Sequence, residues 1–283
     1  MKKIFGNRYL PLYCSKEAEA TAQSFIKKGV HLPNRKLLRT QEQIDGIRES
    51  AKINTALLDC ISENIHEGMT TAEIDHLVYA FTTDHGAIPA PFLFEGYPKS
   101  VCTSINDVVC HGIPDPKQVL KNGDIINVDV STIYRGYFSD ASRTYLIGEV
   151  SEEMQTLVRV ARECRDIGVE AARPWVRLGD VGAAIQEHAE AHGYSVVRAL
   201  CGHGCGVKFH EEPNVNHYGR RDTGMMIVPG MTFTIEPMIN MGHYDVFVDE
   251  DDDWTVYTSD GLPSAQWESQ VLITETGCEI LSQ

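Results

Sequence analysis

The sequence has no Cys-x-x-Cys pair, although eight of its 283 residues are cysteines. It also has no apolar run of about 20 residues, which is the length that crosses a bilayer. No apolar segment suited to a signal peptide follows Met1-Lys2-Lys3. These absences argue against a thiol redox motif, a membrane partner and secretion. We therefore expect a protein with reduced thiols in the cytoplasm.

Basic residues are scarce, because 25 lysines and arginines stand against 40 acidic residues and give a formal charge of −15. This balance argues against DNA, or nucleic acid in general, as a partner of the whole surface. The first 40 residues differ, since nine of them are basic and two are acidic. We predict a basic N-terminal extension over residues 1–39 and a folded body over residues 40–283. The extension either contacts the ribosome through its phosphates or is solvated and disordered.

Capping boxes and apolar periodicity predict the secondary structure of the body. Thr40 with Gln43, and later Thr70 with Glu73, each mark the start of a helix. Alternating apolar residues predict a strand over 124–131. The other expected elements are a strand over 137–146, helices from 151 and over 180–192, and strands over 231–236 and 265–273.

The order of long helix, short helix and strands occurs twice. Asp129 follows Gly123 by six positions, and Glu236 follows Gly230 by six positions, so a turn glycine leads to a carboxylate in both places. This pattern predicts an internal duplication with halves at about 40–148 and 149–283, and coincidence is the alternative.

The segment from 200 to 213 sets His203 and His210 among three glycines and beside two carboxylates. Glycines expose a neighbouring side chain and let the backbone approach closely, as a metal ligand or a proton carrier requires. The alternative is a pair of loop histidines with local hydrogen bonds.

Four carboxylates and one imidazole on strands or glycine-rich turns form a candidate metal site: Asp129, Asp140, His203, Glu236 and Glu268. This oxygen-rich set suits Mn(II), Fe(II) or Co(II) at least as well as Zn(II). Four clustered negative charges require about two divalent cations. His111 and His210 are expected nearby.

The sequence contains two other candidate metal sites. Zinc bound by Cys201, His203 and Cys205 would have no second thiol pair to complete a tetrahedron. The acidic run 249–253 lacks the ligand spacing of a calcium loop, and a solvated hairpin tip is expected there instead.

From about Leu38 to its C-terminus the sequence resembles the type I methionine aminopeptidases. The motifs that carry the resemblance, in order, are YPKSVC (97–102), VCHGIP (109–114), VDV (128–130), SDASRT (139–144), GHGCG (202–206), FHEEP (209–213), TIEP (234–237) and QWE (266–268). The resemblance implies an α+β pita-bread fold, in which two pseudo-symmetric halves with antiparallel sheet covered by helices enclose two metal ions.

The resemblance also implies roles for residues. The positions matching Asp129 and Glu268 hold one ion, those matching His203 and Glu236 hold the other, and Asp140 and Glu268 bridge the two. Glu236 accepts a proton, and His111 and His210 contact the substrate and stabilise the intermediate. The N-terminal methionine of a peptide or nascent chain would bind in a pocket formed by Tyr97, Cys102, Phe209 and Trp254. Segment 91–95 departs from the pattern that many members share, so the resemblance does not assign the residues of the pocket's outer rim.

Three alternatives to a monomeric methionine aminopeptidase stay open at this point. A peptidase specific for X-Pro bonds would keep the fold but carries different histidine spacing and a larger N-terminal domain. A binding protein on the same fold would have lost a ligand, and none of the five is missing. A ribosome- or RNA-docking protein would use the basic extension as its main feature.

Overall fold

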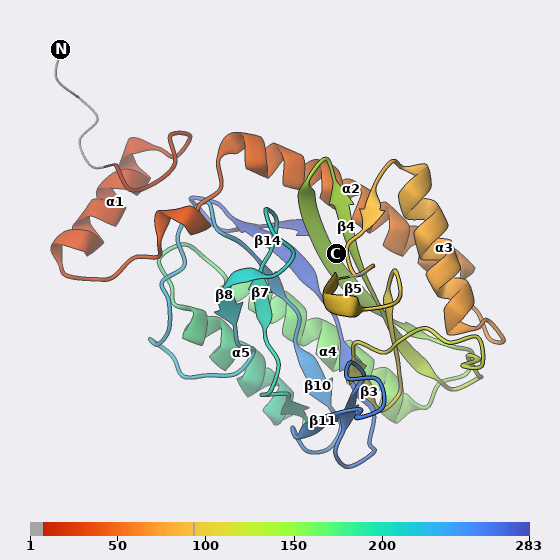
Figure 1. The fold of residues 1–283 in the computed structure, drawn as a ribbon. Coiled ribbons are helices and arrows are strands. Elements are labelled where there is room, and N and C mark those ends of the chain that lie inside the picture. Colours follow the sequence, from red (N-terminus) through yellow and green to blue (C-terminus); the bar gives the residue numbers. More distant parts are fainter. Residues whose placement is uncertain (1–7, 93) are drawn as a thin grey trace.

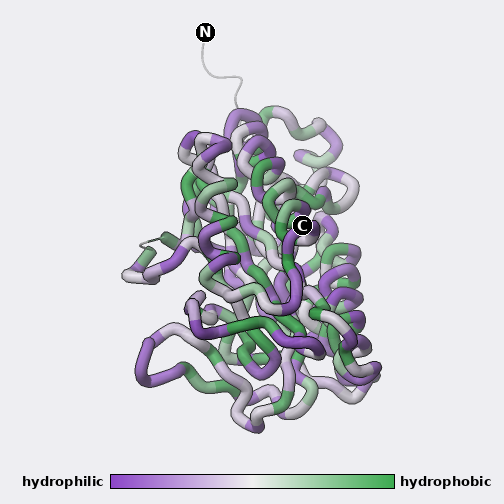
Figure 2. The backbone as a smooth tube through the Cα atoms, turned by 90° about the vertical axis from the view of Figure 1, so that its right-hand side faces the viewer, coloured by the Kyte–Doolittle hydropathy of each residue, from purple (hydrophilic) through white to green (hydrophobic). Residues whose placement is uncertain are grey.

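The computed structural model describes residues 8–92 and 94–283 as an α+β protein (Figure 1). Its helices are α1 (Lys16–Lys27), α2 (Gln41–Asn64), α3 (Thr71–Asp84), α4 (Glu152–Ala171) and α5 (Leu178–Ala191), with short 3-10 turns η1 (Arg35–Leu37) and η2 (Phe94–Gly96). Hydrophobic stretches recur along the interior strands, and hydrophilic ones along the outer loops and helices (Figure 2). None of the helices in the described part of the chain is long and apolar enough to span a membrane.

Helices α2 and α3 cover the sheet of the first half. Both begin with the capping boxes that the sequence predicts, at Thr40 and Thr70. The sheet consists of β1 (Ile88–Pro89), β2 (Cys102–Ile105), β4 (Ile125–Tyr134) and β5 (Tyr137–Leu146), with β4 paired to all three others. Buried side chains such as Leu58, Ile61 and Ile74 from the helices pack against Val128 and Val130 of β4. This core holds the β4–β5 hairpin in place.

Helices α4 and α5 cover the larger sheet of the second half. Its strand order is β15-β14-β9-β7-β8, with bounds Cys278–Ser282, Ser269–Ile273, Thr232–Ile235, Gly202–Gly204 and Glu211–Val215. Leu157, Val160 and Ile185 of the helices share a buried cluster with Phe233 and Val271 of the strands. The second half therefore repeats the arrangement of the first.

Two three-stranded sheets complete the fold. One has the order β13-β10-β6 (Ser264–Gln266, Met238–Asn240, Ser195–Val196), and the other β11-β12-β3 (Val246–Val248, Val256–Thr258, Val108–Cys110). The acidic run 249–253 connects β11 to β12 as an antiparallel hairpin, as expected. Asp252 accepts hydrogen bonds from Trp254 N and Thr255 N there, at 2.8 Å each, so this carboxylate closes the turn.

The expectation of one continuous strand over 265–273 is wrong, because the chain changes sheets at Trp267 and Glu268. β13 pairs with β10, whereas β14 pairs with β9. The opposite strand changes sheets at the same level, between Ile235 and Met238. Pro237 lies in this break and has no N–H to donate to a ladder. Glu236 and Glu268 therefore both lie at a strand break, where the sheets separate.

Residues 8–39 pack on the second half, which disagrees with the disordered alternative for this part of the extension. Leu10, Cys14 and Ala22 are buried in the same cluster as the α4 and α5 side chains. Arg39 is buried and forms an ion pair with Glu211 at 2.6 Å. Residues 1–7, with Lys2 and Lys3, lie outside the described residues. The division at residue 39 stays a prediction.

Candidate metal centre

The predicted site residues all line one cavity of about 430 Å³. The candidate ligands in it are Asp129, Asp140, His203, Glu236 and Glu268. The candidate substrate residues in it are His111, His210, Tyr97, Cys102, Phe209 and Trp254. These residues come from β2, β4, β5, β7 and several connecting segments of both halves. The structure thus brings together side chains that are up to about 170 residues apart in the sequence.

Asp129 and Asp140 meet on one face of the β4–β5 hairpin. Asp140 lies opposite Ser131 in the antiparallel ladder, so Asp129 is its diagonal neighbour. Ser131 Oγ donates a hydrogen bond to Asp140 Oδ1 at 2.7 Å. Asp140 is 4% exposed, and Asp129 Oδ1 is buried with no hydrogen-bond partner in the described part of the chain. A buried oxygen without a donor fits a cation ligand.

His203 presents its Nε2 to the carboxylates. Its Nδ1 lies 3.1 Å from the carbonyl oxygen of Gly204, which accepts only, so Nδ1 carries the proton and Nε2 has a free lone pair. Nε2 lies 3.6 Å from Asp140 Oδ2 and 3.6 Å from Glu236 Oε1. Gly204 allows this strand to pass close to its neighbour, because a Cβ there would lie 2.1 Å from the carbonyl oxygen of Glu212.

The two strand breaks place Glu236 and Glu268 in the same cavity. Thr234 Oγ1 donates to Glu236 Oε1 at 2.6 Å, and Gln266 Nε2 donates to Oε2 at 3.3 Å. Glu268 is 2% exposed, and ligand atoms of Glu268, Asp140 and His203 all lie within 4.8 Å of one another. Neither of the two possible metal-binding groups in the described part of the chain contains a cysteine. Cys205 is fully buried and does not line the cavity, in disagreement with the zinc alternative.

Burial makes the charged carboxylates unfavourable without a cation. It raises the pKa of Asp129 to about 7. It also raises the pKa of Glu236 to about 8, although the Thr234 hydrogen bond acts in the opposite direction. Burial and neighbouring acids raise the pKa values of Asp140 and Glu268 well above their usual range. Burial lowers the pKa of His203 to about 3, with a smaller effect from His210, so its imidazole is neutral. Divalent cations would stabilise this set of ligands.

His111 and His210 also line the cavity. His111 follows β3 with φ +58°, a left-handed conformation uncommon outside glycine. Burial lowers its pKa to about 4, with a smaller contribution from His210. The ring of His210 lies against that of His203, with centroids 4.2 Å apart, and burial lowers its pKa as well. Both imidazoles are therefore neutral at pH 7 and each can donate or accept one hydrogen bond.

Apolar side chains form the wall beside the histidines. Tyr97 is 2% exposed, its Oη lies 3.0 Å from the carbonyl oxygens of Val101 and Gly112, and its ring contacts that of Trp254 at 5.2 Å. Phe209 stacks on His210 with centroids 4.2 Å apart.

The divergent segment 91–95 also reaches the cavity, through Pro91, Phe94 and Glu95. Phe94 contacts Phe209 edge-on at 4.9 Å. Leu93 lies outside the described residues.

Several supporting residues could not be found from the sequence. His217 is fully buried, and its Nε2 accepts a hydrogen bond from Glu236 N at 3.0 Å. Thr234 accepts a hydrogen bond from His203 N at 2.9 Å and also contacts the Glu236 carboxylate. The sequence placed Thr234 on the polar face of the 231–236 strand, together with Glu236, but it gave no sign that Thr234 supports the ligands. No local pattern pointed to His217.

Metal-free protein should lose stability as pH rises from about 6.5 to 8. Acids with raised pKa values keep protons in the folded state that the unfolded chain has already released, so stability falls with pH in this window. The lowered histidine pKa values act in the opposite direction, but only below about 6.5. Thermal unfolding with a chelator present should show the fall, at about 2–4 °C per kcal/mol. A Tm that rises over this window would contradict it.

Comparisons with known proteins agree with the sequence resemblance. The model of metallopeptidase family M24 matches residues 45–275. A methionine aminopeptidase A from Synechocystis sp. is 48% identical over 245 residues, which cover 87% of this chain and 96% of the relative. A solved methionine aminopeptidase from Rickettsia prowazekii is 44% identical with a TM-score of 0.85, covering 87% of this chain and 99% of that one.

A more distant structure shares the fold alone. A prolidase from Pyrococcus furiosus has a TM-score of 0.69 at 24% identity and covers 87% of this chain and 65% of that one. The two-halved α+β architecture is the pita-bread fold that the sequence resemblance implies. The chain therefore belongs to metallopeptidase family M24.

Proposed function

We propose that this chain is a metal-dependent aminopeptidase that removes the N-terminal methionine when the next residue is small. One observation carries the proposal: four carboxylates and a neutral imidazole converge on a cavity that two further neutral histidines also line. The curated and solved relatives at 44–48% identity are named methionine aminopeptidases.

Asp129, Asp140, His203, Glu236 and Glu268 would hold two divalent ions. Manganese, iron and cobalt suit this oxygen-rich set, and zinc fits as well. Such ions supply a water molecule of lowered pKa and polarise the scissile carbonyl group. The buried oxygen of Asp129 without a donor supports this assignment.

Glu236 is positioned to accept a proton. Its Oε2 contacts only the Gln266 amide, at 3.3 Å, among the described residues, and its Oε1 accepts from Thr234. Burial raises the pKa of Glu236 to about 8 in the metal-free site. Bound cations would keep it ionised, and the ionised carboxylate can accept a proton. His111 and His210, neutral at pH 7, would donate hydrogen bonds to the substrate amide and to the oxygen that gains charge.

Tyr97, Cys102, Phe209 and Trp254 would bind the methionine side chain, since aromatic rings and a thiol suit a thioether. Phe94 extends this wall from the segment that departs from the common pattern. A protonated α-amino group would be attracted by the neighbouring carboxylates.

A peptide comparison tests the proposal. Manganese-loaded protein should release methionine from Met-Ala-Ser and should not cleave Ala-Pro, the substrate type of the X-Pro alternative. Met-Leu-Ser should react at least about a hundredfold more slowly, because each misfit in a closed site costs several kcal/mol. Preferred cleavage of Ala-Pro, or of none of the three, would reject the proposal.

We also propose that the chain acts as a cytoplasmic monomer on nascent chains and that its N-terminal extension contacts ribosomal phosphates. Lys27, Lys28 and Lys36 are exposed on that extension. Deleting residues 1–36 would remove buried Leu10 and Ala22 and expose the apolar side chains of the second half that they cover, so charge reversal gives a cleaner test.

Replacing Lys27, Lys28 and Lys36 with glutamate should weaken ribosome co-sedimentation about tenfold at low salt. Peptide cleavage should stay unchanged. A matched triple reversal at exposed Lys52, Lys117 and Lys121 should leave co-sedimentation as it is. Equal effects of the two triple variants would reject a contact through the extension.

A further inference from the structure

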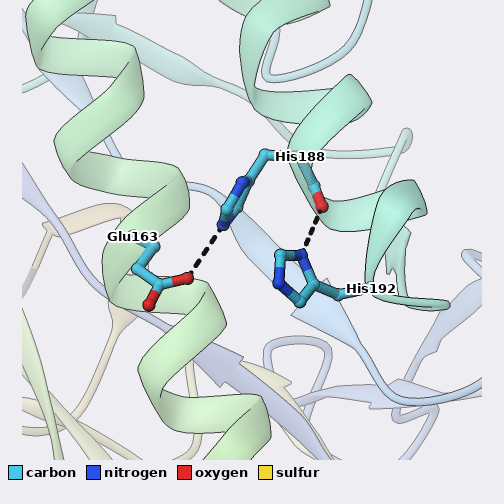
Figure 3. A group of neighbouring side chains, drawn as sticks. All are labelled: Glu163, His188 and His192. Carbon is cyan, nitrogen blue, oxygen red and sulfur yellow. Dashed lines mark hydrogen bonds and ion pairs between the residues drawn. The ribbon is translucent and has the colours of Figure 1, made fainter.

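A second group of possible ligands joins the two helices that cover the larger sheet. Glu163 of α4 faces His188 of α5, and His192 follows one turn later at the C-terminal end of α5 (Figure 3). One ligand atom from each residue lies within 4.8 Å of the others. Two histidines four residues apart share one helix face, which is a common arrangement for binding a transition metal.

Hydrogen bonds within the cluster fix the orientation of both imidazole rings. His188 Nε2 lies 2.9 Å from Glu163 Oε2. His192 Nδ1 lies 2.9 Å from the carbonyl oxygen of His188, so this nitrogen carries the proton. The Nε2 of His192 has a free lone pair, and no hydrogen bond to it exists in the described part of the chain. A metal-binding histidine is typically oriented by such a bond from its other nitrogen.

The spacing is close to what one ion requires. Ligands about 2.0–2.1 Å from a tetrahedral zinc ion lie about 3.4 Å apart. The 2.9 Å between His188 and Glu163 is slightly shorter, and the 4.8 Å limit for the whole group is longer, so small side-chain rotations suffice. The rings of His188 and His192 already lie 4.5 Å apart.

The simpler interpretation is a surface hydrogen bond between His188 and Glu163. It accounts for those two side chains, but it gives no role to the free Nε2 of His192 beside them. Arg159 donates to the other carboxylate oxygen, Glu163 Oε1, at 2.6 Å. The net effect on the Glu163 pKa is a decrease: burial raises it, but the hydrogen bonds from His188 and Arg159 together lower it by more. This carboxylate is therefore ionised near neutral pH. An ionised carboxylate and two imidazoles meet the chemical requirement for a metal.

We propose that Glu163, His188 and His192 form a second divalent-metal site, of the zinc class, that joins α4 to α5. Two imidazoles and one carboxylate favour Zn(II), Ni(II) or Cu(II) over Mn(II), whereas four carboxylates and one imidazole suit Mn(II) well. The exposed His192 leaves the remaining coordination positions to water.

The expected consequence is stability, because the three ligands belong to the helices and not to the cavity. Gly168 of α4 already lets the helix approach Ile185 of α5, since a Cβ there would lie 2.8 Å from the Ile185 side chain. An ion that binds only the folded state stabilises it by mass action. Zinc at a hundred times its dissociation constant should raise Tm by about 5–11 °C through this site.

The test counts zinc in the full-length protein after equilibrium dialysis against buffered micromolar zinc. The His192→Gln variant should hold one equivalent less than the unchanged protein, and Glu163→Gln should weaken that equivalent at least about tenfold. His85→Gln is the matched control. His85 also caps a helix and contacts the carbonyl oxygen four residues earlier at 2.8 Å, but it belongs to neither group of possible metal ligands in the described part of the chain.

Three further readings decide the outcome. His85→Gln should bind as much zinc as the unchanged protein and show the same zinc-dependent rise in Tm, whereas this rise should be smaller in His192→Gln and in Glu163→Gln. Manganese-dependent peptide cleavage should be the same in all variants, which separates this site from the proposed function. Equal zinc content in the unchanged protein, His192→Gln and Glu163→Gln would overturn the proposal.

Discussion

The Asp140→Asn variant should lose at least about a thousandfold in kcat/KM for a Met-Ala peptide while its fold stays intact. The substitution keeps a group that can accept the Ser131 hydrogen bond of 2.7 Å, but it removes one of four negative charges from the cavity. Because we propose that Asp140 helps to hold the ions, its loss would weaken their binding and displace them. Steady-state kinetics with saturating manganese measure the effect.

Stability separates this loss from misfolding. In the metal-free protein, the buried Asp140 carboxylate is unfavourable, because burial and neighbouring Asp129 raise its pKa. Its neutral replacement should therefore leave the Tm of metal-free protein unchanged or higher. Ser131→Ala is the matched control, since it removes the hydrogen bond and keeps the charge, and it should cost about tenfold or less in kcat/KM. A kcat/KM of Asp140→Asn within tenfold of that of the unchanged protein would show that Asp140 is not part of the metal centre.

Removal of divalent metal should abolish peptide cleavage, and Mn(II), Co(II) or Fe(II) should restore it. The reason is the chemistry of the cavity: neutral histidines and protonated carboxylates alone do not lower the pKa of water. Without ions we expect a rate at least about a thousandfold lower. Dialysis against a chelator, followed by titration with each metal under exclusion of oxygen, measures the loss and the return.

The titration also gives the number of ions. Full activity should require about two equivalents of manganese per chain, because one divalent ion balances only two of the four carboxylates. Cleavage that persists after complete demetallation would contradict the mechanism.

Local patterns were sufficient for the first half of the site. Alternation over 124–131 placed Asp129 on a polar face, and the next strand carried Asp140 to the same face of the hairpin. Capping boxes at Thr40 and Thr70 predicted the helices that support this hairpin, because such signals depend on residues three positions apart.

Features that depend on contacts between distant residues could not be predicted from local sequence patterns. The two sheets of the second half separate at Glu236 and at Glu268, and alternation cannot report a change of sheet. His217 supports Glu236 from 19 residues away through a backbone hydrogen bond. Glu163 and His188 meet only because α4 packs on α5. The packing of residues 8–39 likewise depends on apolar side chains of the second half.

Anomalous diffraction from crystals of the manganese-loaded protein would test the central claim most directly. We predict two peaks among Asp129, Asp140, His203, Glu236 and Glu268, with the Asp140 and Glu268 carboxylates lying between them. A single peak outside the cavity, or no peak within reach of these five side chains at full manganese loading, would contradict the account.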